Sequence, residues 1–159
     1  MRADLALVGF GNVGRCFARL LAQRRDWLAL DYDLEYRIVG ISTRRHGWMF
    51  EADGVDAIEA ATSLESAAIS SLGNASTADG SFEIIKRLGQ STADVKAVIE
   101  TTTLDVTAGQ PAIDYVRAAL QSGCDVVTAN KGPVSFAKRC RSSTCVVFVE
   151  SSTAPPITS

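Results

Sequence analysis

The sequence has 159 residues, of which 47% are hydrophobic, and this is enough for one domain of ordinary size with a buried core. The formal net charge is −2 and no long run of one sign occurs, which argues against a nucleic-acid or membrane-surface partner. The N-terminal residues lack the apolar region of a signal peptide, and no apolar run approaches the roughly 18 residues that a membrane span needs. We therefore expect a cytoplasmic protein.

Cysteine and histidine usage gives no sign of a metal site. The chain has four cysteines and one histidine, His46, and no two cysteines form a C-x-x-C pair. This spacing predicts neither a zinc site nor a disulfide framework. We therefore expect no bound metal, and reduced thiols of the kind found in intracellular proteins.

The first part of the chain alternates between strand and helix patterns. Residues 4–8 form a short apolar run that ends at Gly9, which is typical of a strand buried on both faces in a parallel sheet. Apolar residues then recur every three or four positions over residues 13–25, as an amphipathic helix requires. Residues 36–42 are rich in β-branched side chains and predict the second strand.

The pattern weakens between residues 44 and 78 and becomes regular again beyond them. Within that segment the sequence predicts a helix over residues 55–68 and a polar loop over residues 70–79. Further on it predicts helices over residues 82–88, 111–121 and 134–139, and strands over residues 97–102, 124–128 and 145–150. Strands that alternate with helices favour parallel pairing, with helices on both faces of the sheet. We predict a doubly wound α/β fold, a three-layer αβα arrangement around a mostly parallel, Rossmann-like sheet.

A glycine-rich segment, VGFGNVGR, spans residues 8–15 and has G-x-G-x-x-G spacing. The pattern alone is weak evidence, because a tight turn between a strand and a helix also uses glycine without binding a ligand. Here it follows a predicted strand directly and opens a predicted helix. Gly9 can form the tight turn, Gly11 can let a pyrophosphate approach the backbone, and Gly14 can let helix and strand pack closely. We interpret the segment as a dinucleotide-binding loop.

The end of the second predicted strand favours NADP over NAD. An acidic residue at this point binds the ribose 2′-hydroxyl of NAD, whereas a basic one accommodates the 2′-phosphate of NADP. The sequence here reads Ser42-Thr43-Arg44-Arg45 and contains no carboxylate. Hydroxyl and guanidinium groups suit a phosphate, so we expect NADP, with NAD also possible. The alternative is that the arginines are a solvated pair on a loop.

Four motifs resemble the nucleotide-binding domain of homoserine dehydrogenase. They are GFGNVGR (residues 9–15), GISTRRHG (40–47), VIETTTLD (98–105) and DVVTANKGPV (125–134), and they occur in the order of that family. The run TANKGP is far more specific than the glycine pattern, and the resemblance covers about residues 4–150. It implies an oxidoreductase that interconverts aspartate β-semialdehyde and homoserine with a nicotinamide cofactor, on the route to threonine and methionine.

The resemblance also implies roles for individual residues. The glycine segment would hold the pyrophosphate, the loop after the second strand would face the adenosine ribose, and the end of the third strand would lie along the nicotinamide ribose. The active-site edge would follow the fourth strand. The implied cofactor residues are Gly9, Phe10, Gly11, Asn12, Val13, Gly14, Thr43, Arg44, Arg45, Thr101, Thr102, Thr103, Ala129 and Asn130, and the implied catalytic residues are Lys131 and Glu150.

The two implied catalytic residues differ in how well their surroundings match the family. An ammonium at Lys131 suits hydride transfer, because it can stabilise charge on a carbonyl oxygen or relay a proton; the alternative is an ordinary surface lysine. Glu150 falls where the family has a glutamate near the substrate and a monovalent-cation loop. The glycine-containing continuation of the family is replaced here by SSTAPP, residues 151–156, which argues against the cation site.

We predict a NAD(P)-binding domain over residues 1–150 and a Ser/Thr/Pro-rich tail over residues 151–159, where the substrate domain of the family would begin but is absent. A chain without that domain is expected to be catalytically incomplete. Three interpretations stay open: a truncated or short homoserine dehydrogenase, a stand-alone NADP-binding module that regulates or joins a partner, and an enzyme repurposed for an unrelated substrate. A homodimer or partner chain would cover the apolar surface that a missing domain exposes.

Overall fold

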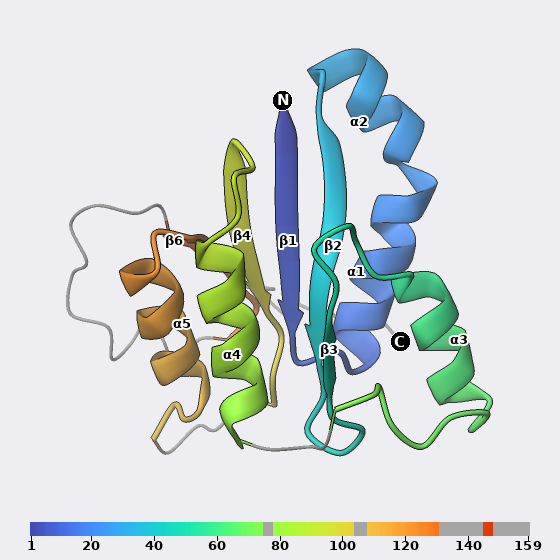
Figure 1. Ribbon diagram of the computed structural model, residues 1–159, viewed down its shortest axis with the longest axis vertical. Helices are drawn as coiled ribbons and strands as arrows, with labels where there is room; N and C mark the ends of the chain where they lie inside the picture. The colour runs from blue at the N-terminus through green and yellow to red at the C-terminus, as the bar shows by residue number, and fades with distance from the viewer. Residues whose placement is uncertain (75–77, 104–107, 131–144, 148–159) are drawn as a thin grey trace, which may run out of the picture.

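The computed structural model describes residues 1–74, 78–103, 108–130 and 145–147. They form a six-stranded sheet in the order β3-β2-β1-β4-β5-β6, in which every neighbouring pair is parallel except β2 and β3 (Figure 1). The strands are β1 (Arg2–Val8), β2 (Glu35–Ser42), β3 (Trp48–Phe50), β4 (Val95–Glu100), β5 (Asp125–Thr128) and β6 (Cys145–Val147). The helices are α1 (Asn12–Gln23), α2 (Arg25–Tyr32), α3 (Ala57–Glu65), α4 (Ala78–Gly89) and α5 (Ala112–Gln121).

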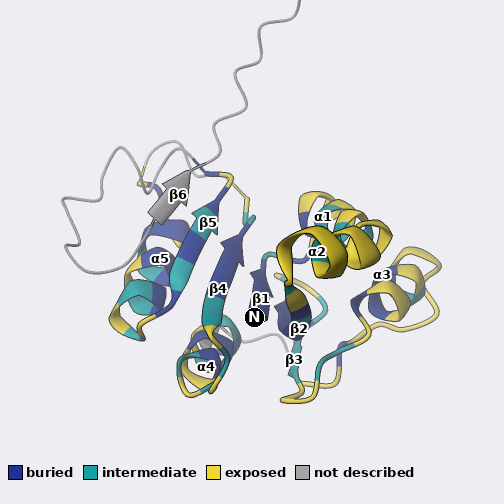
Figure 2. Cartoon of the chain, turned by 90° about the horizontal axis from the view of Figure 1, so that it is seen from above, coloured by how far each residue is buried: buried dark blue, intermediate teal, exposed yellow. Residues whose placement is uncertain are grey.

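The sheet is the middle of three layers, with α1, α2 and α3 on one side and α4 and α5 on the other (Figure 2). Successive side chains of a strand point to opposite faces, and β1 feeds both hydrophobic cores. Leu7 packs in the cluster that includes residues of α1 and α3, whereas Val8 packs in the cluster that includes residues of α4 and α5. The predicted doubly wound, three-layer fold is therefore confirmed.

An ion pair between a buried carboxylate and a half-buried arginine lies at the amino end of the sheet. Asp4 of β1 is 2% exposed, and its carboxylate accepts hydrogen bonds from Arg37 Nε at 2.9 Å, from Arg37 Nη2 at 2.8 Å and from the Ser91 hydroxyl at 2.5 Å. Burial alone would raise the pKa of Asp4, but the hydrogen bonds from Arg37 and Ser91 and the positive charge of Arg37 outweigh it and lower the pKa. This carboxylate joins β1 to β2 and to the segment before β4.

The helix predicted over residues 13–25 is wrong at its end. Helix α1 stops at Gln23, because Arg24 leaves the helical conformation with φ −102° and ψ 7°, and a separate helix, α2, follows. None of the residues of α2 is fully buried, and Leu28 packs half-buried against the core, so this helix has too small a buried face for the sequence pattern to predict it. The predicted polar loop over residues 70–79 also runs too far, since α4 already begins at Ala78.

Two further differences concern the strands and α3. Strand β3, which the pattern did not predict, has only three residues and pairs antiparallel with the end of β2, too short a segment to show a period of two. The strand predicted over residues 97–102 ends at Glu100. The helix predicted over residues 55–68 is shorter because Asp56 caps its start, accepting hydrogen bonds from the backbone N–H groups of Ile58 and Glu59.

Some expectations fall on residues that the structure does not describe. The helix predicted over residues 134–139 and the last part of the strand predicted over residues 145–150 lie outside the described residues. None of the helices in the described ranges is long and apolar enough to cross a bilayer.

Candidate nucleotide site at the carboxyl edge of the sheet

The loops that follow β1, β2, β4 and β5 meet at one edge of the sheet, because these four strands are parallel. β1 lies between β2 and β4, so the chain leaves β1 toward the face covered by α1 and leaves β4 toward the face covered by α5 (Figure 2). Ligands of open α/β sheets bind in the crevice at such a reversal of strand order. The described residues that the sequence predicts for a cofactor lie on these four loops or at the start of α1.

The glycine loop is held in place by the end of β2. The carbonyl oxygen of Ser42 accepts hydrogen bonds from the backbone N–H groups of Gly9, at 3.1 Å, and Phe10, at 2.6 Å. The N–H of Gly11 donates to the Gly9 carbonyl at 2.7 Å, and the Phe10 side chain is fully buried. These three amides are used within the protein, so they shape the loop and are not free to bind a ligand.

The three glycines of the loop differ in the space around them. A Cβ on Gly9, whose φ is +95°, would lie 2.6 Å from the carbonyl carbon of Thr101, and a Cβ on Gly14 would lie 3.0 Å from the Gly9 carbonyl oxygen. In the described part of the chain, the nearest atom to a Cβ on Gly11 outside the adjacent residues would be 4.0 Å away, and its φ of −90° suits any residue. The fold therefore explains Gly9 and Gly14, whereas Gly11 borders open space that a bound group can occupy.

The start of α1 presents backbone N–H groups without partners. Within the described ranges, the N–H groups of Asn12, Val13 and Gly14 donate to no acceptor, and the first described bond of the helix runs from Arg15 to the Gly11 carbonyl at 2.9 Å. No side chain caps this end of α1, and no acidic residue lies in its first turn. Free N–H groups and the positive end of the helix dipole together form a site for an anion such as a phosphate.

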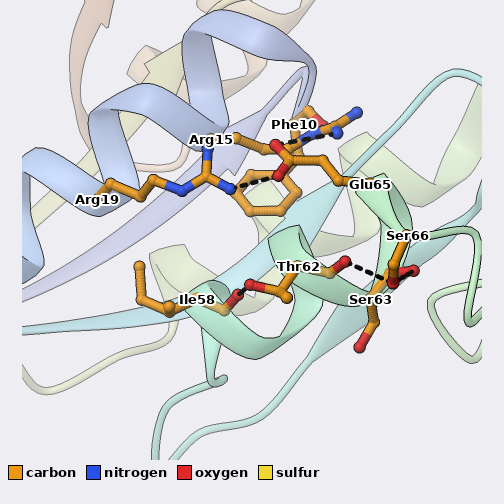
Figure 3. Close-up of polar contacts among 8 residues, drawn as sticks. All are labelled: Phe10, Arg15, Arg19, Ile58, Thr62, Ser63, Glu65 and Ser66. Atoms are coloured by element: carbon orange, nitrogen blue, oxygen red, sulfur yellow. Dashed lines mark hydrogen bonds and ion pairs between the residues drawn. The ribbon is translucent and has the colours of Figure 1, made fainter.

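Arg15 fixes α1 close to the glycine loop. Its Nε donates to the Phe10 carbonyl at 3.4 Å, and its Nη1 lies 3.5 Å from Oε1 of Glu65 on α3 (Figure 3). Arg19, one turn further along, donates to the same carboxylate at 2.6 Å, and this hydrogen bond lowers the pKa of Glu65. The described contacts of Arg15 therefore hold α1 against α3 and support the loop.

The loop after β2 presents two arginines at the surface. Thr43 closes this loop, because its hydroxyl accepts a hydrogen bond from the His46 N–H at 2.7 Å and donates to the Gly47 carbonyl at 3.2 Å. The side chains of Arg44 and Arg45 are exposed beside it. Thr43 thus shapes the loop, and Arg44 and Arg45 lie at its surface.

The three threonines after β4 occupy different surroundings. The Thr101 hydroxyl donates to the Gly9 carbonyl at 2.8 Å and so joins the two loops on either side of the crevice. Thr102 turns back toward the strand, with its N–H 2.8 Å and its hydroxyl 2.5 Å from Oε1 of Glu100. Thr103 is exposed. Thr101 and Thr102 are therefore engaged in the protein, and Thr103 is open to solvent.

Glu100 is a residue of this edge that sequence analysis did not single out. It is the last residue of β4, it is completely buried, and its carboxylate also accepts a hydrogen bond from Thr128 at the end of β5, at 2.5 Å. Asn130 is 6% exposed and donates from Nδ2 to both carboxylate oxygens, at 2.8 and 3.0 Å. The available signal was a carboxylate that directly follows the apolar run Ala97-Val98-Ile99 of β4, a position where burial is costly unless the carboxylate is hydrogen-bonded.

The remaining predicted residues follow β5. The N–H of Ala129 donates to the Glu100 carbonyl at 3.0 Å, which extends the pairing of β4 and β5, and its side chain is exposed. Lys131 and Glu150, the predicted catalytic residues, lie outside the described residues. The described part of the chain contains no group of three or more His, Cys, Asp or Glu side chains placed to hold a metal ion.

Comparison with known proteins identifies the family. A family model described as the NAD binding domain of homoserine dehydrogenase matches residues 9–143. The chain belongs to the homoserine dehydrogenase family. It is 30% identical over 134 residues to homoserine dehydrogenase of Methanocaldococcus jannaschii, and 35% identical over 133 residues to NAD(+)-dependent homoserine dehydrogenase of Pseudomonas canavaninivorans. These matches cover 84% and 83% of this chain but only 38% and 36% of the relatives, so the chain spans little more than a third of their length.

Solved structures of homoserine dehydrogenases share the fold. The crystal structure of the enzyme from Thermoplasma acidophilum gives a TM-score of 0.64 at 22% identity, over 84% of this chain and 37% of that one. A hyperthermophilic archaeal homoserine dehydrogenase in complex with NADPH gives a TM-score of 0.61 at 23% identity, over 86% of this chain and 38% of that one. These structures confirm the Rossmann-like fold, and the family model with the two relatives confirms the family resemblance and the assignment as a NAD(P)-binding domain.

Proposed function

We propose that this chain supplies the NADP-binding half of a homoserine dehydrogenase, an oxidoreductase that interconverts aspartate β-semialdehyde and homoserine in amino-acid biosynthesis. The observation that carries the proposal is the start of α1, where three N–H groups without a described partner lie beside a glycine with open space around it. A helix start of this kind attracts phosphate groups. The family match over residues 9–143 supports a nicotinamide dinucleotide as the ligand.

The residues present fit the pyrophosphate of a nicotinamide dinucleotide. The N–H groups of Asn12, Val13 and Gly14 would donate to it, and the missing side chain of Gly11 would let it approach the backbone. No acidic side chain in the first turn of α1 opposes this charge. Gly9 and Phe10, whose amides are bonded to Ser42, would position the loop and not contact the phosphates directly.

The loop after β2 supports a preference for NADP. The end of β2 carries no carboxylate that would bind a 2′-hydroxyl, and the exposed Arg44 and Arg45 suit a 2′-phosphate. The relative from Pseudomonas canavaninivorans is named NAD(+)-dependent, and the hyperthermophilic archaeal structure contains NADPH, so both cofactors occur among similar proteins. We propose NADP as the preferred cofactor of this chain, with NAD accepted more weakly.

The nicotinamide ring, when bound, supplies or accepts the hydride. We propose that Lys131, which directly follows Asn130 in the TANKGP motif, stabilises the charge on the carbonyl oxygen and relays a proton. Glu150 is proposed to act beside the substrate. Support for both roles comes from the motif and from the position of Asn130 at the edge where the described site residues meet.

We further propose that residues 1–150 form the nucleotide-binding domain and that a substrate domain, of this or a partner chain, completes the active site. The match to little more than a third of the relatives supports this division. Small-molecule substrate specificity would then depend on residues beyond this domain, and a homodimer or a partner chain would bring them to it. Cys16 and Cys124 are free thiols, which fits a reducing compartment such as the cytoplasm.

The first test is a titration of the 159-residue chain with NADPH, followed by the fluorescence of the reduced nicotinamide. We expect saturable binding with one site per chain, and competition by NADP⁺. Absence of binding at millimolar NADPH would contradict the proposal, because the described amides and loop belong entirely to this chain.

The second test concerns the reaction. The protein encoded by the complete reading frame should oxidise NADPH in the presence of aspartate β-semialdehyde. Lys131→Ala should lower its turnover by about 100-fold or more, while the affinity for NADPH stays within a few-fold of the wild type. Turnover that survives Lys131→Ala would contradict the role of this lysine. NADPH binding without any turnover of the semialdehyde would instead favour a module that regulates or joins a partner.

A further inference from the structure

At the ends of β4 and β5 lies a fully buried carboxylate, Glu100, to which the function proposed above gives no role. Within the described residues, every hydrogen-bond contact of its two oxygens is with a group able to donate. Oε1 faces the N–H and the hydroxyl of Thr102 and the side-chain amide of Asn130, and Oε2 faces the Thr128 hydroxyl and the same amide. A buried charge is tolerated only when its hydrogen-bonding capacity is filled in this way.

This arrangement determines which way the side chain of Asn130 points. Its Nδ2 lies 2.8 and 3.0 Å from the oxygens of Glu100 and 3.0 Å from the Thr102 carbonyl. The carbonyl and an ionised carboxylate are pure acceptors, so an amide turned the other way would place its own oxygen against three oxygens. Both N–H bonds are therefore directed inward, and no described residue donates to the amide oxygen, Oδ1.

The backbone of Asn130 is fixed by the same group of residues. Its N–H donates to the Thr128 hydroxyl at 3.0 Å, while that hydroxyl donates to Glu100. Asn130 is thus held at both its backbone and its side chain, directly before Lys131 in the chain. In the loop after β4, Glu100 also accepts two hydrogen bonds from Thr102, which directly precedes the exposed Thr103.

We propose that Glu100 is a positioning residue for the cofactor: it orients the amide of Asn130 so that Oδ1 accepts a hydrogen bond from a hydroxyl or carboxamide N–H group of the nicotinamide half. This inference rests on the proposed function. Glu100 itself does not touch the cofactor, because it is completely buried. Its role requires an acceptor-only group, since a glutamine would bring two N–H donors against the donors of Asn130 and Thr102.

The test compares two buried carboxylates at opposite ends of the sheet. Glu100→Gln alters the carboxyl edge, and Asp4→Asn alters the amino edge, where Asp4 is equally buried and hydrogen-bonded to Arg37. Both variants of the 159-residue chain should unfold at lower temperature than the wild type. We expect Glu100→Gln to weaken NADPH binding by about 10-fold or more, and Asp4→Asn to change it by less than about 2-fold.

A second readout, independent of the cofactor, is the NMR signal of the Asn130 side-chain amide. Its two protons should be shifted and slowly exchanging in the wild type and in Asp4→Asn, because they donate to buried acceptors, and should move to the values of a solvated asparagine in Glu100→Gln. Glu100→Asp, which keeps the charge, should recover part of the affinity. If Glu100→Gln does not fold, Thr128→Val removes one donor of the group and should produce the same changes to a smaller extent.

The outcomes separate this proposal from the function on which it rests. A wild-type chain that binds no NADPH would contradict the proposed function, while the amide signal would still test whether Glu100 orients Asn130. Wild-type affinity in Glu100→Gln, or an equal loss in Asp4→Asn, would show that Glu100 contributes only to stability and would overturn the inference. An unchanged Asn130 signal in Glu100→Gln would overturn it as well.

Discussion

Gly9 and Thr101 hold the two sides of the crevice together: the Thr101 hydroxyl donates to the Gly9 carbonyl at 2.8 Å, and a Cβ on Gly9 would lie 2.6 Å from the Thr101 carbonyl carbon. The two residues directly follow β1 and β4, the strands between which the chain changes direction. Close backbone contact at this point leaves no room for a side chain. The first glycine of the loop is therefore a requirement of the fold as much as of the ligand.

We expect Gly9→Ala to destabilise the chain by about 2 kcal/mol or more. The φ of +95° is unfavourable for a residue with a Cβ, and the added carbon would overlap the backbone of Thr101 and Thr102, which cannot yield as a flexible side chain would. Urea unfolding followed by circular dichroism measures the effect. A variant as stable as the wild type would show that the two loops do not touch in solution.

Gly11→Ala should do the opposite: leave stability within about 0.5 kcal/mol and weaken NADPH binding by about 10-fold or more. Among the described residues, the nearest atom to this Cβ outside the adjacent residues is 4.0 Å away, and the φ of −90° suits alanine. It would occupy the space through which we propose that the pyrophosphate reaches the N–H groups of α1. Unfolding and NADPH titration of the same preparation distinguish the two effects, and unchanged affinity would place the phosphates elsewhere.

Sequence predicted the fold well where a residue's surroundings follow from its position in a strand or helix. The apolar run before Gly9 indicated a strand buried on both faces, and the structure places Leu7 and Val8 in opposite cores. Helix α2 escaped prediction for the converse reason, since none of its residues is fully buried and its buried face is too small to mark a pattern. The alternation of apolar and polar residues indicates which side chains are buried, so it does not predict elements that bury few side chains.

The residues of the candidate site also differ in how well the sequence predicted them. The glycine segment and the arginines after β2 were predictable because the relevant groups are neighbours in sequence. Glu100 and Asn130 were not recognisable as a pair, because they are brought together only by the parallel pairing of β4 and β5. The role of Thr43 was also not predictable. Its hydroxyl donates to the Gly47 carbonyl within the turn, and this contact depends on the path of the backbone.

The ion pair of Asp4 and Arg37 predicts how stability depends on pH. The folded pKa of Asp4 is lowered, so its contribution is fully present above the unfolded value of about 3.9 and is lost as the pH falls through the lower folded pKa. Asp4→Asn should cost about 2 kcal/mol at pH 7, because it removes the charge of a buried carboxylate that accepts two hydrogen bonds from the half-buried Arg37. The difference from wild type should stay constant down to about pH 5 and shrink below about pH 4.

The control for this prediction is a carboxylate at the surface. Glu65 also has a lowered pKa, caused first by the hydrogen bond from Arg19, but it lies in an exposed pair, where solvent screens the interaction. Glu65→Gln should therefore change urea unfolding far less than Asp4→Asn at pH 7. Equal effects of the two substitutions, or a difference for Asp4→Asn that does not shrink in acid, would contradict the assignment of this pH dependence to Asp4.

The chain offers its own control for the preference between NADP and NAD. Arg44 and Arg45 lie after β2 at the carboxyl edge, whereas a second adjacent pair, Arg24 and Arg25, lies at the far end of α1. Replacing Arg44 and Arg45 by alanine should weaken NADPH binding by about 10-fold or more and NADH binding by less than about 3-fold, because only NADPH carries the 2′-phosphate that the guanidinium groups can bind. Replacing Arg24 and Arg25 by alanine removes the same charge and should change the affinity for neither cofactor.

Equal losses of affinity for NADPH and NADH in the Arg44 and Arg45 variant would contradict recognition of the 2′-phosphate. They would mean that the arginines act through general electrostatic attraction, and both affinities would then depend strongly on salt.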